Sequence, residues 1–188
     1  MALLNPFKGN NSNLVTMFNP EIYTERRNAL RKLMPSGIIL LPGNTEAAYN
    51  YPANTYTFRQ DSNFSYFFGL ENPDFVGVMD IDNGTDYIFG NDFGIDDIIW
   101  MGPQPKVIDL AAKVGVKNTS TLSELGVFLS NAIRKRRPVH FAPAYRAETT
   151  LQLSSLLGLT PSRIRDYASL PLIEAIVKLR SIKADIEV

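Results

Sequence analysis

The segment FRQDSNFSYFFGL, residues 58–70, decides the fold of this 188-residue chain. Asp61 or Ser62 can cap a short helix, because their side-chain oxygens accept hydrogen bonds from the free N–H groups of a first helical turn. Gly69 can adopt the left-handed conformation that ends a helix. Three aromatic side chains share one face of that helix at i, i+3 and i+4: Phe64, Phe67 and Phe68. The segment therefore predicts a short helix with its aromatic face in the core.

The chain before this segment predicts one helix and one buried strand. Asn19-Pro20 is typical of a helix start, and the breakers at 35–37 end the helix. Its apolar side is predicted to hold Ile22, Ala29, Leu30 and Leu33. Its charged residues Arg26, Arg27, Arg31 and Lys32 are predicted to face water. The apolar run 37–41 suits a strand buried on both faces. A long polar loop containing Tyr49, Tyr51 and Tyr56 is expected next.

The chain after the segment alternates strands and helices. Asn83-Gly84 predicts a β-hairpin with strands over 75–82 and 85–90. A short apolar strand is predicted over 98–102, followed by a helix that opens at Pro103 and Pro105. The Thr121–Glu124 capping box opens another helix, whose last cations, residues 134–137, complement its dipole. A strand over 139–142, a helix over 146–157 and a helix from Ser169 complete the order.

This order predicts an α/β class fold. It is a single layered domain whose mixed sheet, largely a β-hairpin plus parallel strands, is flanked by helices.

Composition excludes several functional classes. The 19 basic residues balance the 19 acidic ones, so we expect no nucleic-acid partner. The chain has no cysteine, which rules out disulfides and thiolate metal sites. No apolar run approaches the roughly 20 residues of a membrane helix, so we expect no membrane partner. Residues 1–18 are expected to form a flexible extension and not a secretory signal, which favours a cytoplasmic location.

The inventory of reactive groups predicts no catalytic and no metal-binding residue in this chain. His140 is the sole histidine, and its strand context favours a structural role. The spacing of Asp80 and Asp82 before Gly84 invites comparison with a calcium loop, but the third and twelfth ligand positions are unsuitable. The nucleophile-elbow, P-loop and dinucleotide motifs are absent from the sequence.

The residue order RQDSNFSYFFGL at 59–70 resembles the R-Q-[ND]-S-x-F-x-Y-[FL]-[TF]-G signature of the N-terminal domain in aminopeptidase P, prolidase and creatinase relatives. Other pieces resemble the family in the same order. They are the Arg26-Arg27 helix, the strand 37–41, the strand after Asn72-Pro73-Asp74, the I-W-x-G segment around Trp100, and the "R-x-I-K" junction at 180–183.

The resemblance implies an N-terminal domain of a pita-bread metallopeptidase. Residues 19–170 would form the creatinase-like N-terminal domain, and 171–188 the connector helix and the start of a C-terminal catalytic domain. The parent would be a metal-dependent Xaa-Pro aminopeptidase. Its catalytic domain would hold two divalent metal ions, which in this family are typically manganese. Its substrate would be a peptide with proline at the second position. The partners implied are its own catalytic domain and further copies in a homodimer or homotetramer.

The same resemblance implies roles for four residues. Trp100 would contact substrate in a neighbouring subunit, although packing in a core or interface suits a sole tryptophan equally well. Arg59, Tyr66 and Gly69 would be structural signature residues. The fragment alone is expected to be inactive and to serve oligomerisation and gating of a neighbouring active site. Two alternatives stay open: a stand-alone pseudo-peptidase module that binds proteins, and a prolidase as the parent.

Overall fold

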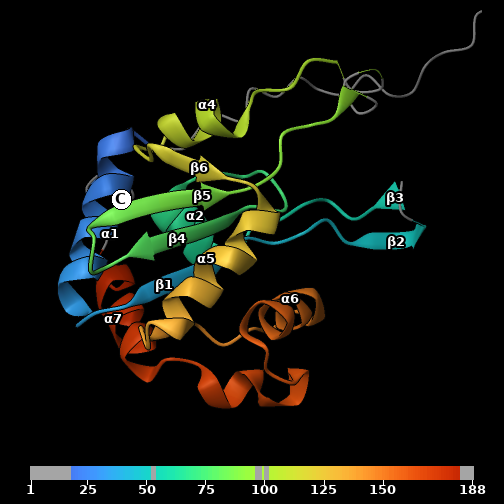
Figure 1. Cartoon of the computed structure of the whole chain (residues 1–188). Helices are drawn as coiled ribbons and strands as arrows, with labels where there is room; N and C mark the ends of the chain where they lie inside the picture. Colours follow the sequence, from blue (N-terminus) through green and yellow to red (C-terminus); the bar gives the residue numbers. More distant parts are fainter. Residues whose placement is uncertain (1–17, 52–53, 96–98, 100–101, 183–188) are drawn as a thin grey trace, which may run out of the picture.

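A five-stranded mixed sheet forms the centre of the domain (Figure 1). The computed structural model describes residues 18–51, 54–95, 99 and 102–182. The sheet has the order β6-β5-β4-β1-β7, with antiparallel β1, β4 and β5 in the middle and β6 and β7 parallel to their neighbours. The strands are β1 (Ile38–Pro42), β4 (Val76–Asp80), β5 (Thr85–Phe89), β6 (Asn118–Ser120) and β7 (Val139–Phe141). This architecture confirms the predicted α/β class and mixed sheet.

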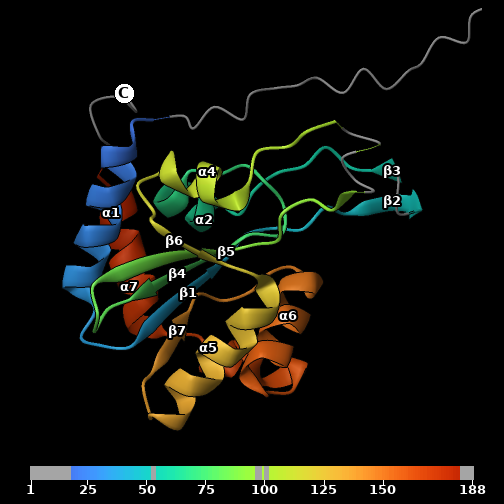
Figure 2. The same cartoon turned by 45° about the horizontal axis from the view of Figure 1, so that its top comes forward.

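Helices cover both faces of the sheet (Figure 2). One face carries α1 (Pro20–Leu33), α2 (Ser62–Phe68), α4 (Val107–Ala112) and α7 (Leu170–Arg180). The other carries α5 (Leu122–Arg134), α6 (Ala147–Leu157) and the 3-10 helix η1 (Pro161–Tyr167). Side chains of β1 alternate between the two cores, Ile39 and Leu41 toward the first and Ile38 and Leu40 toward the second. The prediction of a strand buried on both faces is confirmed.

Helix α2 forms as its sequence predicts. Asp61 caps it by accepting from the N–H groups of Asn63 and Phe64 at 2.9 and 3.0 Å. Gly69 ends it in the left-handed region with φ 63°. All three predicted core aromatics are fully buried against β1 and β4: Phe64, Phe67 and Phe68. The aromatic face is therefore the centre of the first core.

Helix α1 begins at the predicted Asn19 cap and buries Leu30 as predicted. The predicted exposure of its two adjacent arginines and the predicted burial of Leu33 are wrong. Arg27 is fully buried and Arg26 is 8% exposed, whereas Leu33 is 38% exposed. The buried side of the helix is Tyr23, Arg26, Arg27 and Leu30, spaced at i, i+3, i+4 and i+7. Two cations thus occupy core positions, which requires that hydrogen-bond acceptors meet them there.

The predicted β-hairpin of β4 and β5 forms, but β4 already ends at Asp80, so the turn spans residues 81–84 and not Asn83-Gly84 alone. Gly84 has φ 66°. Asp80, at the end of β4, accepts from the backbone N–H and the Nδ2 of Asn83 at 3.0 and 2.8 Å. Arg137, at the start of the chain leading to β7, pairs with both Asp80 and Asp82. Burial alone raises the pKa of Asp80, but the hydrogen bonds from Arg137 and Asn83 outweigh it and hold the pKa below its usual value.

Asp80→Asn is expected to lower the free energy of unfolding by about 1–3 kcal/mol at pH 7, because charge-assisted bonds are lost. A carboxylate whose pKa is depressed by folding stabilises the fold above its unfolded pKa, and this contribution is lost as the pH falls through the folded pKa. The gap between wild type and variant should therefore shrink below about pH 4. Denaturant titrations across pH measure it, with Asp109→Asn on the exposed side of α4 as control. A gap that stays constant down to pH 2 would contradict this account.

Four parts of the chain differ from the sequence predictions. The expected polar loop contains a two-stranded arm, β2 (Ala48–Tyr51) and β3 (Asn54–Thr55). The edge strand β6 and the helix η1 were not predicted. The expected strand over 98–102 is not extended where the structure describes it, since Ile99 is helical and Gly102 has φ 77°.

Three further observations concern the N-terminal extension, helix α7 and membrane insertion. The predicted flexible extension lies outside the described residues, except for Phe18. Helix α7 belongs to the first core, with Leu172 fully buried and Ala175 and Ile176 at most 6% exposed. Within the described part of the chain, none of the helices is both long and apolar enough to cross a membrane.

Candidate functional site

The signature segment is held by the buried side-chain amide of Gln60. Its Oε1 accepts from the N–H of Asn44 at 2.7 Å and from that of Asp61 at 2.8 Å. Its Nε2 donates to the carbonyls of Leu70 and Asn72 at 3.2 and 2.8 Å. One side chain therefore joins the segment after β1 to the residues before and after α2. Sequence reasoning quoted Gln60 in the signature but gave it no role.

Asp61 links α2 to the chain that follows β7. While Oδ1 caps the helix, Oδ2 accepts from the hydroxyl of Tyr145 at 3.0 Å. Burial first, and then the charge of Asp61, raise the pKa of Tyr145. A shallow hollow beside this pair is lined by residues of β1, α6 and the chain after β7. Both oxygens of the Asp61 carboxylate thus accept hydrogen bonds that stabilise the fold.

Tyr66 lies between two cations from different helices. The guanidinium carbon of Arg26 in α1 is 4.0 Å from the ring centroid of Tyr66, and that of Arg180 in α7 is 5.7 Å from it. Arg26 also donates to the carbonyl of Tyr66 at 3.1 Å. The Tyr66 hydroxyl donates to the carbonyl of Leu179 at 3.2 Å. A single signature residue therefore connects α1, α2 and α7.

The polar positions of the signature hold the last turn of α7. Nη1 of Arg180 donates to Oδ1 of Asn63 at 2.7 Å and to Oγ of Ser62 at 3.2 Å. Arg180 is the last residue of α7. Ser62 and Asn63, together with Tyr66, thus hold the last turn of α7 against α2. We call this set of contacts, Ser62, Asn63 and Tyr66 with Leu179 and Arg180, the α2–α7 clamp.

Tyr66→Phe is expected to loosen the last turn of α7 while leaving the aromatic packing intact. The lost hydrogen bond to Leu179 should cost about 1 kcal/mol, because a net protein hydrogen bond is worth about that much. Hydrogen exchange of the amides at the end of α7 should accelerate several-fold. Tyr167→Phe, which removes an exposed hydroxyl on η1, is the matched control. Equal exchange in wild type and Tyr66→Phe would show that the clamp does not operate.

The predicted signature residues have different surroundings. A Cβ on Gly69 would lie 2.1 Å from Cζ of the buried Tyr23, so this position requires glycine for space as well as for φ. Arg59 has an exposed side chain, and its carbonyl accepts from Nδ2 of Asn44 at 2.8 Å. Its structural role stays a prediction. Trp100, predicted to contact substrate, lies outside the described residues.

The buried cation Arg27 supports the signature from the other side. Its Nη1 donates to the carbonyl of Phe67 at 2.9 Å and its Nη2 to the carbonyl of Val114 at 2.9 Å. Its Nε pairs with Asp86 at 2.8 Å, and Arg31 pairs with the same carboxylate. Burial lowers the pKa of Arg27, and Asp86 opposes that effect. The sequence analysis predicted that Arg27 faces water and therefore missed this role, because no local pattern indicates that its side chain is buried.

The described residues offer few groups for catalysis. Among them, no cluster of three or more His, Asp or Glu side chains could hold a metal ion. Both ring nitrogens of His140 lie within hydrogen-bonding distance of a partner, Nδ1 of Ser169 Oγ at 2.9 Å and Nε2 of the Ser36 carbonyl at 3.0 Å. The histidine thus joins β7 to the segments before β1 and before α7, as its predicted structural role requires.

The fold of this chain is similar to part of solved aminopeptidase P structures. Zinc-substituted Escherichia coli aminopeptidase P in complex with product is similar at a TM-score of 0.62 and 23% identity, over 75% of this chain and 33% of that one. Pseudomonas aeruginosa aminopeptidase PepP is similar at a TM-score of 0.66 and 20% identity, over 82% of this chain and 35% of that one. The match thus spans about a third of the length of these structures.

The chain belongs to the aminopeptidase P N-terminal domain family. The model of the family "Aminopeptidase P, N-terminal domain" matches residues 23–140, from α1 to β7. A search of curated proteins finds no match. The matched range contains the whole signature segment and ends before α6, so the α2–α7 clamp joins family residues to a helix beyond the match.

Proposed function

We propose that this chain is the non-catalytic N-terminal domain of a metal-dependent Xaa-Pro aminopeptidase. In this role it supports oligomerisation and gates the active site of a neighbouring subunit. The parent removes the N-terminal residue that precedes proline from a peptide. A catalytic domain outside this chain would hold two divalent metal ions, manganese in our proposal, which would supply an activated water and a Lewis acid for the scissile carbonyl.

The α2–α7 clamp is the observation that carries this proposal. The polar side-chain groups of the signature residues Ser62, Asn63 and Tyr66 form hydrogen bonds with the end of α7. Such contacts fix the direction of the last turn of α7. An accessory domain has to orient its catalytic partner in this way. Family membership supports the peptidase parent.

We also propose that Trp100 contacts the substrate bound by a neighbouring subunit. The proposed location of the enzyme is the cytoplasm. The proposed role of Trp100 rests on the I-W-x-G segment of the sequence. In the full-length enzyme, Trp100→Ala should raise KM for a peptide with proline at position two more than it lowers kcat. A loss of folded protein instead would favour a packing role for Trp100.

The purified 188-residue chain with added manganese is expected to release no N-terminal residue from an Xaa-Pro peptide. The expectation follows from the lack of a described cluster of His, Asp and Glu ligands. Chromatography of the peptide after incubation measures release, and the longer native polypeptide in the same buffer is the positive control. Turnover by the chain that survives a chelator would contradict the non-catalytic assignment.

The same assay separates the alternatives. Release from Xaa-Pro dipeptides alone, by the native polypeptide, would identify a prolidase parent. No release by the native polypeptide from either substrate would favour a protein-binding module.

A further inference from the structure

The β2–β3 arm projects from the end of the sheet, away from the body of the domain (Figures 1 and 2). Its strands pair with each other in antiparallel fashion through Ala48 with Thr55 and Tyr51 with Asn54. A two-stranded hairpin on its own is at best marginally stable in water. An arm of this kind gains stability when a further surface packs against it.

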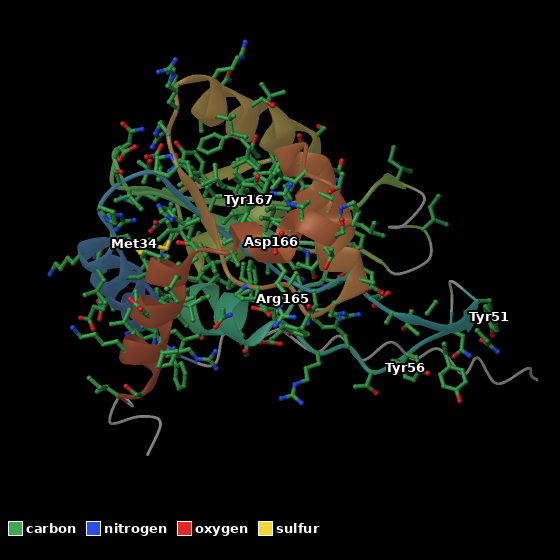
Figure 3. All side chains as sticks on the ribbon, turned by 90° about the horizontal axis from the view of Figure 1, so that it is seen from below. Met34, Tyr51, Tyr56, Arg165, Asp166 and Tyr167 are labelled. Carbon is green, nitrogen blue, oxygen red and sulfur yellow. The ribbon has the colours of Figure 1, made fainter. Side chains whose placement is uncertain are left out.

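The arm carries large aromatic side chains that the domain does not cover. Tyr49, Tyr51 and Tyr56 are 63%, 57% and 56% exposed, and the rings of Tyr49 and Tyr56 lie 4.7 Å apart across the two strands. Figure 3 shows Tyr51 and Tyr56 on the arm, clear of the body. Tyrosine is enriched at protein interfaces, because its ring buries a large area while its hydroxyl keeps a polar partner. We call these three residues the arm face.

The chain that follows β5 also carries exposed apolar groups. It runs toward the end of the sheet from which the arm projects (Figure 1). It carries Phe93 and Ile95, which are 43% and 79% exposed. Concentrated exposed apolar groups mark an interaction surface more often than scattered ones do. Helix α7, by contrast, lies at the opposite end of the domain, beside α1 (Figure 1).

The charge pattern indicates which surface covers the arm face. Residues 47–58 contain no acidic and no basic side chain. A two-fold axis places each residue of a face opposite the same face of the partner, so any charge near the axis meets its like. Natural sheets protect free edges from self-pairing with charged residues, and the strands of this arm carry none. The uncharged arm face can therefore pack against the arm face of a second copy without repulsion between like charges.

We propose that two copies of this chain dock arm to arm through Tyr49, Tyr51 and Tyr56. The inference deepens the proposed function, because it rests on the oligomerisation role and names the surface that performs it. Docking would bury the arm face of both copies.

The solution mass of the 188-residue chain tests the proposal, measured by size-exclusion chromatography with light scattering over a range of concentrations. Wild type should weigh about twice the 21.0 kDa of one chain. The variant Tyr49→Ser/Tyr51→Ser/Tyr56→Ser should raise the dimer dissociation constant about 1,000-fold, at about tenfold for each of the three tyrosines. Tyr167→Ser, a tyrosine 49% exposed on η1, is the matched control and should leave the dimer unchanged. Unchanged circular dichroism would show that the variants fold.

Cysteine cross-linking adds a second readout, because the natural chain has no cysteine. Tyr51→Cys should give a covalent dimer with a short bismaleimide, whereas Tyr167→Cys should not. A dimer that survives the triple serine variant would overturn the arm as its interface and leave oligomerisation standing. If the wild-type chain were a monomer at every concentration, both the arm interface and the proposed oligomerisation role would be wrong. Neither result touches the peptidase role of the parent, which the release assay tests separately.

Discussion

Arg27→Met is expected to lower the free energy of unfolding by about 2–6 kcal/mol, because two buried carbonyl acceptors lose their donors. The methionine keeps the packing volume but leaves the buried carbonyls of Phe67 and Val114 without their donors. Each orphaned buried acceptor costs about 1–3 kcal/mol. Arg31 still neutralises Asp86, so the cost falls mainly on the two carbonyls. Chemical denaturation of the 188-residue chain measures the change.

Arg163→Met is the matched control for Arg27. Arg163 pairs with Asp166 in η1, but both side chains are more than half exposed. An exposed pair contributes little, so the variant should stay within about 0.5 kcal/mol of wild type. If Arg27→Met also stayed within that margin, the account of the buried cation as a support of α2 would be wrong.

Gly69→Ala is expected to cost about 2–5 kcal/mol, from two separate effects. An alanine in the left-handed region costs about 1–2 kcal/mol. Its Cβ would also meet the Tyr23 ring, with Cζ at 2.1 Å and Cε1 at 2.4 Å. Forced overpacking of this kind typically costs about 1–3 kcal/mol. Because Tyr23 is 1% exposed, its ring can move only by disturbing the first core.

Gly158→Ala separates the two effects. Gly158 ends α6 with φ 66°, close to the φ of Gly69, but nothing lies within 4 Å of its added Cβ. It should therefore show the backbone cost alone, about 1–2 kcal/mol. Equal losses at Gly69 and Gly158 would mean that the ring contact with Tyr23 contributes nothing, and that Gly69 is a helix end like any other.

Local signals explain which parts of the fold could be predicted. The caps at Asn19 and Asp61, the Thr121–Glu124 box and the left-handed Gly69 each act over four residues or fewer. A sequence window contains all the atoms that decide such features. The Asn83-Gly84 turn and the buried run of β1 belong to the same group.

Contacts between distant segments explain what could not be predicted. Arg27 bonds to Phe67 and Val114, which lie 40 and 87 residues away, so its own helix gives no sign that it is buried. Strand β6 has three residues and forms only because β5 offers a parallel edge. The residue order of the signature predicted the family, but the partners of Ser62, Asn63 and Tyr66 in α7 depend on the folded arrangement.

The size of the native polypeptide that carries this sequence tests the central claim most directly. The E. coli enzyme suggests a parent of roughly 430 residues, because 75% of this 188-residue chain covers 33% of that structure. An immunoblot of the source cells with an antibody against α5 should therefore show a band more than twice the 21.0 kDa of this chain. A band at 21.0 kDa and none above it would contradict the claim that the domain serves a catalytic partner in the same polypeptide.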